Sequence, residues 1–299
     1  MTNWHKRLSK RLAEGPGHTP APAGPVSPPA DALAPIVYPR DLPVPPPRPQ
    51  APPAPPGPCV SLDDALVGVS LDAPLGGQAL LVARGADEIE GNFAPLSHAY
   101  AAMLADADHP LYVHVPGQCG QRPLAPRDII FLDLETTGLH TGNVFLAGAL
   151  LWENDQLVIK QFFARDYAEE RAVVSLFLAA AGGRKLLVSF NGKSFDLPYL
   201  RVRAAACRVP FQPAWGHMDM LHVSRKTWGR QFGDCKLQTL ERHLCQRYRH
   251  DDIPGSAIPE AYHDYVRTGN AVHMAAVIKH NMLDLLTLAE LMTRLPGSL

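Results

Sequence analysis

Residues 129–135 place the first constraint on the fold, because four consecutive apolar residues run directly into two carboxylates. The sequence IIFLDLE predicts a buried strand, and side chains two positions apart on a strand point to the same face. Asp133 and Glu135 would then lie side by side, where like charges repel and burial disfavours both ionised forms. A divalent cation would offset that cost. This strand end therefore predicts a metal site, provided that other segments bring further ligands to it.

The clearest succession of elements spans residues 128–295. Three apolar or alternating runs separated by turn-like segments predict a meander of three strands, IIFLDLE, VFLAGALLW and QLVIKQFF. Helical spacing over 166–181 is followed by the strand KLLVSF, by a helix over 195–207 with Ser194 as its cap, and by further helices that end with one over 272–294. Strands first and helices later around one apolar core predict an α/β domain of the α+β layered kind.

The first 127 residues have a different character. Residues 16–58 contain 18 of the 30 prolines, and a segment so rich in proline can form neither ladders nor a core, so we expect a disordered, extended linker. Residues 1–15 have apolar residues at four-residue spacing beside basic ones, which indicates either a short amphipathic helix or a frayed tail. Such a helix could bind a membrane surface, nucleic acid or a protein partner. Residues 59–127 predict a small preamble that packs on the main domain, with LGGQALLVARG as a strand, SHAYAAMLADA as a helix and DHPLYVHV as another strand.

Composition excludes several classes of protein. The 28 Lys and Arg against 29 Asp and Glu leave no global basic signal for nucleic acid. The five cysteines form no CxxC pair and no zinc-ligand spacing, which is typical of reduced thiols in a cytoplasmic protein. No apolar run reaches the roughly 18 residues that a membrane span needs, and the N-terminus lacks the apolar core of a secretory signal. We therefore expect a cytoplasmic protein without a membrane span.

Two more acids occur at positions where the surrounding sequence offers no obvious structural role for a carboxylate. Asp196, in NGKSFDLPYL, comes at the start of a predicted helix, and Asp284, in HNMLDLL, has apolar neighbours within the last helix. Each also has a structural alternative, because an acid in a first turn favours the helix dipole and Asp284 could face solvent. Together with Asp133 and Glu135 they supply the hard oxygen ligands that Mg²⁺ or Mn²⁺ prefers.

His280 lies four residues before Asp284, so on a helix the two side chains share a face. Two cations about 3.5–4 Å apart can activate a water molecule and stabilise the leaving oxygen of a phosphodiester. A histidine beside that water is suited to act as the general base. The alternative is a histidine with a capping or packing role.

Three motifs in this order, DLETTG, NGKSFD and HNMLD, resemble the exonuclease motifs of the DEDD superfamily. The phrases SFNGKSFDLPYL, DIPGSAIP and HNMLDLLTL are similar to its YprB-like branch, and the resemblance covers about residues 128–295. It implies a ribonuclease H-like fold, a mixed sheet flanked by helices. It also implies 3′→5′ exonuclease activity, with two metal ions held by Asp133, Glu135, Asp196 and Asp284 and with His280 as the base. DEDD exonucleases with a histidine base usually place it five residues before the last Asp, whereas the four-residue spacing found here usually carries a tyrosine.

Residues 200–249 hold ten Lys and Arg against three acids, a local excess of +7, with Trp215, Trp228 and Phe232 among them. This pattern suits a phosphate backbone with stacking bases, and its alternative is a solvated helical surface. We therefore expect a metal-dependent nuclease of the 3′→5′ exonuclease type that acts on single-stranded DNA or RNA ends. Two alternatives stay open. One is a non-catalytic nucleic-acid-binding or scaffolding module, and the other is a phosphohydrolase of small nucleotides.

Overall fold

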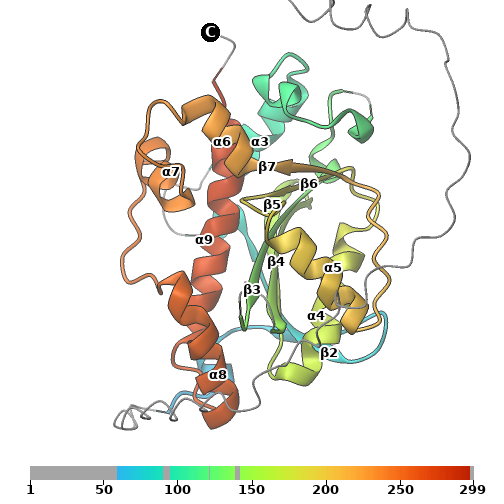
Figure 1. Ribbon diagram of the computed structural model, residues 1–299, viewed down its shortest axis with the longest axis vertical. Helices are drawn as coiled ribbons and strands as arrows, with labels where there is room; N and C mark the ends of the chain where they lie inside the picture. Colours follow the sequence, from blue (N-terminus) through green and yellow to red (C-terminus); the bar gives the residue numbers. More distant parts are fainter. Residues whose placement is uncertain (1–58, 90–94, 121, 139–141, 297–299) are drawn as a thin grey trace, which may run out of the picture. The chain divides into compact units, whose positions relative to one another are not determined.

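The computed structural model describes residues 59–89, 95–120, 122–138 and 142–296. Within these residues a seven-stranded sheet has the strand order β1-β2-β5-β4-β3-β6-β7 (Figure 1). The strands are β1 (Val69–Asp72), β2 (Gln78–Gly85), β3 (Ile129–Thr136), β4 (Val144–Glu153), β5 (Gln156–Phe163), β6 (Leu186–Ser189) and β7 (Gly216–Asp219).

The sheet is mixed. β3, β4 and β5 form the expected antiparallel meander, whereas β6 pairs parallel to β3 and β7 parallel to β6. The first eight residues of β4 are all buried. A strand that is covered on both faces has a continuous apolar sequence, and the first eight residues of β4, VFLAGALL, have this pattern. The prediction of an α/β layered domain with a mixed sheet is confirmed.

Helices cover both faces of the sheet. The α-helices are α2 (Leu62–Ala65), α3 (Leu96–Ala105), α4 (Glu170–Ala181), α5 (Asp196–Ala206), α6 (Met220–Trp228), α7 (Leu237–Leu244), α8 (Ile258–Thr268) and α9 (Met274–Thr293). The short 3₁₀ helices are η1 (Ala86–Glu88), η2 (Pro110–Val113), η3 (Gly117–Cys119), η4 (Pro126–Asp128), η5 (Tyr167–Glu169) and η6 (Gly255–Ala257).

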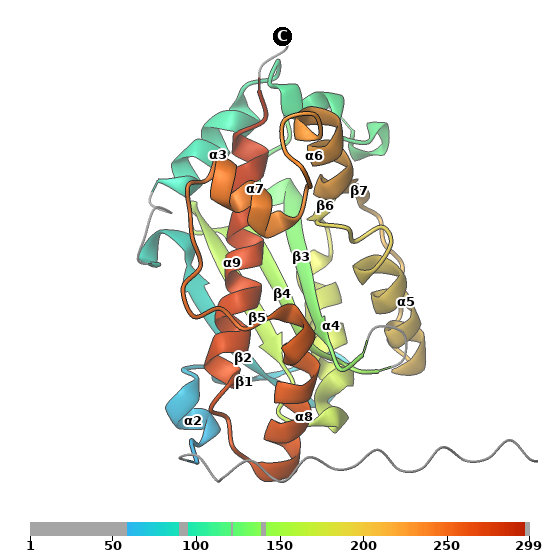
Figure 2. The same ribbon diagram turned by 60° about the vertical axis from the view of Figure 1, so that its left-hand side comes forward.

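Two apolar cores follow from this layering. One lies between the sheet and α4 and α5, and it continues to α8 and the beginning of α9. The other lies between the opposite face and α3, α6, α7 and the rest of α9. α9 runs along β3 and β4 in both views (Figures 1 and 2), which brings the last motif of the sequence next to the first.

The preamble differs in detail from its prediction. β2 pairs with β5, so residues 69–85 add two strands to the main sheet; the domain boundary at residue 128 stays a prediction. The expected strand DHPLYVHV is wrong, because Pro110–Val113 forms the 3₁₀ helix η2. Pro110 has no N–H to give to a ladder, and the His109 ring accepts a hydrogen bond from the Leu111 N–H at the start of the turn.

The predicted tail at 1–15 and linker at 16–58 lie outside the described residues. The five cysteines form no disulfide in the described part of the chain, which includes all of them. No helix among the described residues is both long and apolar enough to cross a membrane.

Candidate metal centre

β3 presents Asp133 and Glu135 near its end, in the middle of the sheet. β6 pairs with β3 only as far as Phe131, so both acids lie beyond the last parallel rung. Both side chains are half-buried, and the apolar residues that alternate with them are buried. The strand period thus places the two carboxylates on one face, as predicted from their spacing.

Asn281 on α9 fixes the orientation of Asp133. Its Nδ2 donates to Asp133 Oδ2 at 2.7 Å and to the Asp133 carbonyl at 3.1 Å. Its Oδ1 accepts from Gln161 Nε2 at 2.9 Å, and Gln161 also donates to the Ile278 carbonyl at 2.8 Å. Asn281 is fully buried and fits because β4 has Gly148 at that point, where a Cβ atom would lie 2.1 Å from Asn281 Oδ1.

Asp196 comes from the first residue of α5 and reaches back to β3, where its Oδ1 accepts from the Leu134 N–H at 3.2 Å. The predicted cap, Ser194, is wrong: the N-cap is Phe195, which makes no side-chain cap hydrogen bond. The turn before α5 is held instead by Asp219, at the end of β7. Its carboxylate accepts from the Asn191 N–H at 2.8 Å and from the Lys193 N–H at 3.0 Å.

Asp284 and His280 share one face of α9, one turn apart, as their spacing predicts. His280 Nδ1 lies 2.9 Å from Asp252 Oδ1, while Nε2 lies 3.7 Å from Asp284 Oδ2. A carboxylate at Nδ1 favours the tautomer that carries its proton there, which leaves Nε2 as the acceptor. The histidine is thus oriented by Asp252 with its second nitrogen toward Asp284.

The four acids act on one another electrostatically. Burial raises the pKa of Asp133 and Glu135 well above the usual range, and Asp284 is the next largest cause for both. Burial also raises the pKa of Asp196 to about 7, with smaller contributions from Asp219 and Asp284. Burial raises the pKa of Asp284 as well, although Arg249 and His280 oppose this rise. Four carboxylates from β3, α5 and α9 therefore lie near enough to one another to destabilise their ionised forms.

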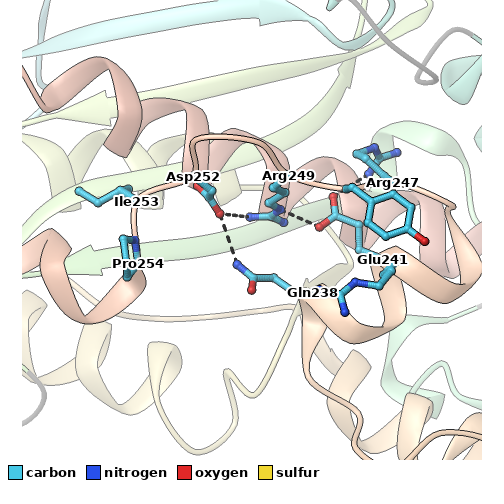
Figure 3. Close-up of a pocket in the computed structure, with 9 residues that line it drawn as sticks. Gln238, Glu241, Arg247, Arg249, Asp252, Ile253 and Pro254 are labelled. Atoms are coloured by element: carbon cyan, nitrogen blue, oxygen red, sulfur yellow. Dashed lines mark hydrogen bonds and ion pairs between the residues drawn. The ribbon is translucent and has the colours of Figure 1, made fainter.

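A pocket of about 290 Å³ lies beside this centre, between α7 and the segment that leads to η6 (Figure 3). Its wall includes Arg249 and Asp252, which contact Asp284 and His280. At its mouth Arg242 lies over the ring of Tyr248, 5.8 Å from the centroid. The pocket is lined by Gln238, Glu241, Arg242, Arg247, Tyr248, Arg249, Asp252, Ile253 and Pro254.

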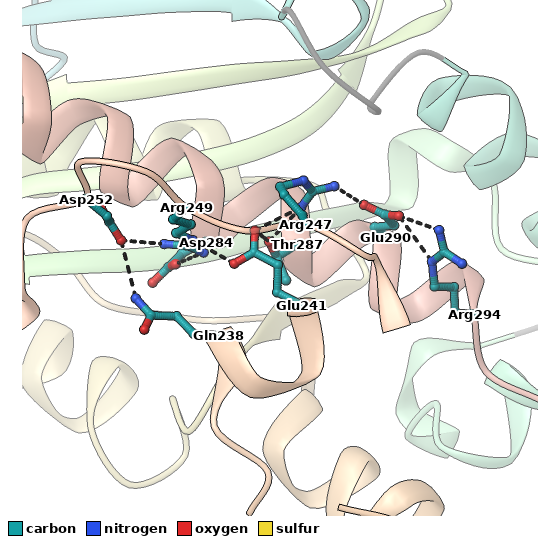
Figure 4. Close-up of polar contacts among 9 residues, drawn as sticks. All are labelled: Gln238, Glu241, Arg247, Arg249, Asp252, Asp284, Thr287, Glu290 and Arg294. Atoms are coloured by element: carbon teal, nitrogen blue, oxygen red, sulfur yellow. Dashed lines mark hydrogen bonds and ion pairs between the residues drawn. The ribbon is translucent and has the colours of Figure 1, made fainter. Parts of the chain in front are cut away.

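Arg249 connects the pocket to the carboxylates (Figure 4). Its Nη2 lies 2.6 Å from Asp284 Oδ1, its Nε donates to Glu241 Oε2 at 2.6 Å, and its Nη1 lies 3.3 Å from Asp252 Oδ2. The side chain is 5% exposed. Burial lowers the pKa of Arg249, but the charges of Asp284 and Glu241 and the hydrogen bonds to them outweigh it and raise the pKa above the usual value.

The donor set suits a hard divalent cation, because it consists of carboxylate oxygens whose mutual repulsion such a cation would relieve. Asp133, Glu135, Asp196 and Asp284 are the residues that would hold Mg²⁺ or Mn²⁺. In the part of the chain that the structure describes, no three His, Cys, Asp or Glu side chains converge as ligands of a single ion. The chemistry of the site fits the metal, while one of its four carboxylates, Asp284, is paired with Arg249.

The basic stretch at 200–249 proves heterogeneous. Arg203 forms a buried ion pair with Glu170 at 2.6 Å, and Arg247 and Arg249 are likewise engaged with buried acids. Trp215 and Trp228 are buried in the cores and cannot stack on bases. The prediction of interleaved stacking aromatics is therefore wrong for both tryptophans, because Trp215 packs in one apolar core and Trp228 in the other. The other seven basic residues are exposed: Arg201, Arg208, Arg225, Lys226, Arg230, Lys236 and Arg242.

Sequence reasoning did not identify Arg249, Asp252 or Asn281. Asp252 opens the phrase DIPGSAIP and Asn281 lies within HNMLD, so both are inside segments that carry the family resemblance. Nothing in the local pattern of RYRHDD distinguishes Arg249 from Arg247 or from the exposed Arg242 nearby.

Comparison with known proteins agrees with the fold. Residues 130–296, more than half of the chain, match the family model of the RNase H superfamily. The chain is 31% identical over 169 residues to the uncharacterized protein YprB of Bacillus subtilis (strain 168), which covers 55% of this chain and 41% of that protein. It thus spans about two fifths of the length of that curated relative.

A solved structure is also similar, that of the family B DNA polymerase from the hyperthermophilic archaeon Pyrobaculum calidifontis. The similarity has a TM-score of 0.44 and 16% identity, and it covers 55% of this chain and 24% of the polymerase chain. The family match, together with the mixed sheet and its flanking helices, confirms the expected ribonuclease H-like fold. The chain belongs to the RNase H superfamily.

Proposed function

We propose that the protein is a metal-dependent nuclease, a 3′→5′ exonuclease that hydrolyses phosphodiester bonds at single-stranded ends of nucleic acid. Asp133, Glu135, Asp196 and Asp284 are the proposed ligands of two Mg²⁺ or Mn²⁺ ions, and His280 is the proposed general base. The polarity of the reaction rests on the resemblance to the DEDD exonucleases.

The observation that carries this proposal is that four carboxylates from three separate elements lie near enough to one another to raise their pKa values. Acids that only stabilise a fold are paired with cations or hydrogen-bond donors, because each unpaired buried charge costs several kcal/mol. Here only Asp284 of the four acids is paired with a guanidinium, that of Arg249, while burial and the neighbouring carboxylates raise the pKa of Asp133 and Glu135. Titratable groups perturbed in this way are characteristic of functional sites.

Protein groups around the centre have distinct roles in this mechanism. Asn281 orients Asp133, and Asp219 holds the turn that delivers Asp196. Asp252 holds Nδ1 of His280, so that Nε2 can take the proton of the attacking water. Bound divalent ions would activate that water and stabilise the charge that develops on the leaving oxygen.

Contacts for the nucleic acid are proposed in the neighbouring pocket. Tyr248 is 63% exposed and lies under Arg242, and both belong to the same mouth of the pocket. A guanidinium can bind a phosphate while an exposed aromatic ring stacks on a base. Since Arg249 and Asp252 line the same pocket and contact the catalytic side chains, a strand bound there would reach the carboxylates.

The non-catalytic alternative also has an observation in its favour, namely the ion pair between Arg249 and Asp284. If that pair were permanent, one of the four acids would be unavailable to a metal. The module would then bind nucleic acid through its exposed basic residues without turnover.

Cleavage of oligonucleotides labelled at either end, single-stranded DNA or RNA, with and without Mn²⁺ or Mg²⁺, tests the proposal. The wild type is compared with Asp133→Asn and with Glu153→Gln, an acid at the far end of β4 that pairs with Lys160. We expect stepwise shortening from the 3′ end that requires metal and is unchanged in Glu153→Gln. In Asp133→Asn the rate of cleavage should fall at least about a hundredfold, because loss of a metal ligand raises the activation free energy by several kcal/mol.

Two other results would replace the proposal. Tight binding of both polymers without metal-dependent cleavage would establish the non-catalytic module. Hydrolysis of free nucleotides with intact polymers would establish a small-nucleotide phosphohydrolase.

A further inference from the structure

The guanidinium of Arg249 contacts Asp284, one of the four acids at which the divalent cations are proposed to bind. We propose that Arg249 is an internal counter-ion that competes with the divalent cation for Asp284, so that metal binding requires Arg249 to leave this carboxylate. This inference rests on the proposed function, because it assigns Arg249 a role in metal binding at the proposed catalytic centre.

Competition follows from the position of the ion pair. Arg249 Nη2 is 2.6 Å from Asp284 Oδ1, and the opposite oxygen of Asp284 faces His280. Mg²⁺ binds carboxylate oxygens at about 2.0–2.1 Å. A dication on Asp284 would therefore come within a few ångströms of a buried guanidinium, where the repulsion between like charges is only weakly screened.

The contact with Asp284 is as short as that with Glu241 but is less well aligned as a hydrogen bond. Within the described part of the chain, neither Arg249 Nη2 nor Asp284 Oδ1 has a well-aligned hydrogen bond, although the two atoms are close. The bond from Arg249 Nε to Glu241, in contrast, is both short and aligned. Rotation about the end of the side chain would therefore release Asp284 first.

The remaining acids of the network keep partners when Arg249 moves. Glu241 also accepts from Thr287 Oγ1 at 3.0 Å and pairs with Arg247 at 3.0 Å. Asp252 retains the His280 ring and also accepts from Gln238. Asp284 would keep only the more distant His280 ring among the contacts that these side chains make, and it becomes the carboxylate that needs a new cation.

The chain around Arg249 provides room for this movement. Residues 246–254, which connect α7 to η6, contain no helix or strand. Arg249 also lines the pocket of about 290 Å³, and Asp284 is not among the residues that line it (Figure 3). A guanidinium released from Asp284 can enter this pocket, where the phosphate of a bound strand is proposed to lie.

The test measures binding of Mn²⁺ alone to the full chain by isothermal titration calorimetry, for the wild type, Arg249→Gln and Arg247→Gln. Arg247 is the matched control, since it contacts the same Glu241 but pairs on its other side with Glu290. We expect Arg249→Gln to bind Mn²⁺ at least about tenfold more tightly than the wild type, which corresponds to about 1.4 kcal/mol. Arg247→Gln should stay within about threefold of the wild type, a difference of less than 1 kcal/mol.

A second measurement on the wild type does not depend on whether Arg249→Gln folds. The ¹⁵N–¹H signals of the arginine side chains, with that of Arg249 assigned by Arg249→Lys, are followed during addition of Mg²⁺. We expect the signal of Arg249 to shift and its exchange with solvent to accelerate, while the signal of Arg247 stays in place.

The outcomes distinguish failure of the counter-ion role of Arg249 from failure of the proposed nuclease function. Unchanged or weaker Mn²⁺ binding in Arg249→Gln, an equal gain in Arg247→Gln, or an unperturbed Arg249 signal at saturating Mg²⁺ would overturn the counter-ion role. If the wild type still cleaves nucleic acid with metal, the proposed function survives that result. Absence of Mn²⁺ binding in all three proteins would overturn both.

Discussion

Gly148 is the position at which the sheet and the candidate site are most tightly linked. In Gly148→Ala the new Cβ would lie 2.1 Å from Oδ1 and 2.9 Å from Cγ of Asn281. Favourable carbon contacts are about 3.5–4.0 Å, so the Asn281 side chain has to move by more than about 1 Å. That movement breaks its hydrogen bond to the Asp133 carboxyl.

The cost can be estimated from these two effects. Overpacking of a buried site costs about 1–3 kcal/mol, and loss of a hydrogen bond to a charged group adds about 1.5–3 kcal/mol. We therefore expect Gly148→Ala to lower the free energy of unfolding by about 2.5–6 kcal/mol. Gly233→Ala is the control, because a Cβ there meets no atom within 4 Å, and it should change stability by less than about 0.5 kcal/mol.

Urea denaturation of a double-mutant cycle tests the reasoning. In an Asn281→Ala background the obstructing amide is gone, so Gly148→Ala should cost less than about 1 kcal/mol, which makes the coupling energy at least about 1.5 kcal/mol. Equal costs of Gly148→Ala in both backgrounds would refute the argument, since the clash with Asn281 would then not be the cause.

Three further predictions follow from burial and charge. The pKa of Asp196 is about 7 in the folded protein against 3.8 unperturbed, so without metal the folded state binds more protons and stability falls as pH rises from about 4 to 7. Denaturation across this range in EDTA should show that slope, and Asp196→Asn should flatten it. Arg203→Met removes the ion pair of the buried Glu170, which keeps the hydrogen bonds from Asn143 Nδ2 and the Val144 N–H, and should cost about 1.5–3 kcal/mol in chemical denaturation, with unchanged affinity for oligonucleotides. Arg242→Gln should weaken oligonucleotide binding severalfold in fluorescence anisotropy and reduce the salt slope by about one. Arg201→Gln is the control, because it removes an equal charge that also lies over an aromatic ring. An equal loss of oligonucleotide affinity in Arg201→Gln would show that Arg242 contributes only non-specific charge.

Much of the main domain follows from local pattern. The meander of β3, β4 and β5 and the long final helix lie within a few residues of their predicted ranges, because apolar periodicity reports directly which faces are buried. The four acids could be singled out for a related reason. A carboxylate inside an apolar pattern contradicts the burial that its neighbours predict, and the contradiction is visible without coordinates.

The ends of elements were less predictable. Ser194 has the side chain of a good cap, yet Asp219, from another strand, holds the turn before α5. The basic stretch shows the same limit, since Arg203 and Arg242 look alike in sequence while one is in a buried ion pair and the other is exposed. Composition counts charges but does not say which of them face a partner.

The sequence by itself determined the meander of β3, β4 and β5 and the long final helix, and it singled out the four acids, because those depend on the periodicity of neighbouring residues. Only the tertiary structure decided which groups meet. Asp196 reaches Leu134 across 62 residues, and Asn281 reaches Asp133 across 148. Arg249 likewise finds Asp284 through the packing of α7 on α9. Such pairings depend on how the two faces of the sheet are covered, and side-chain charge and hydrogen bonding act only once that packing has brought the groups within reach.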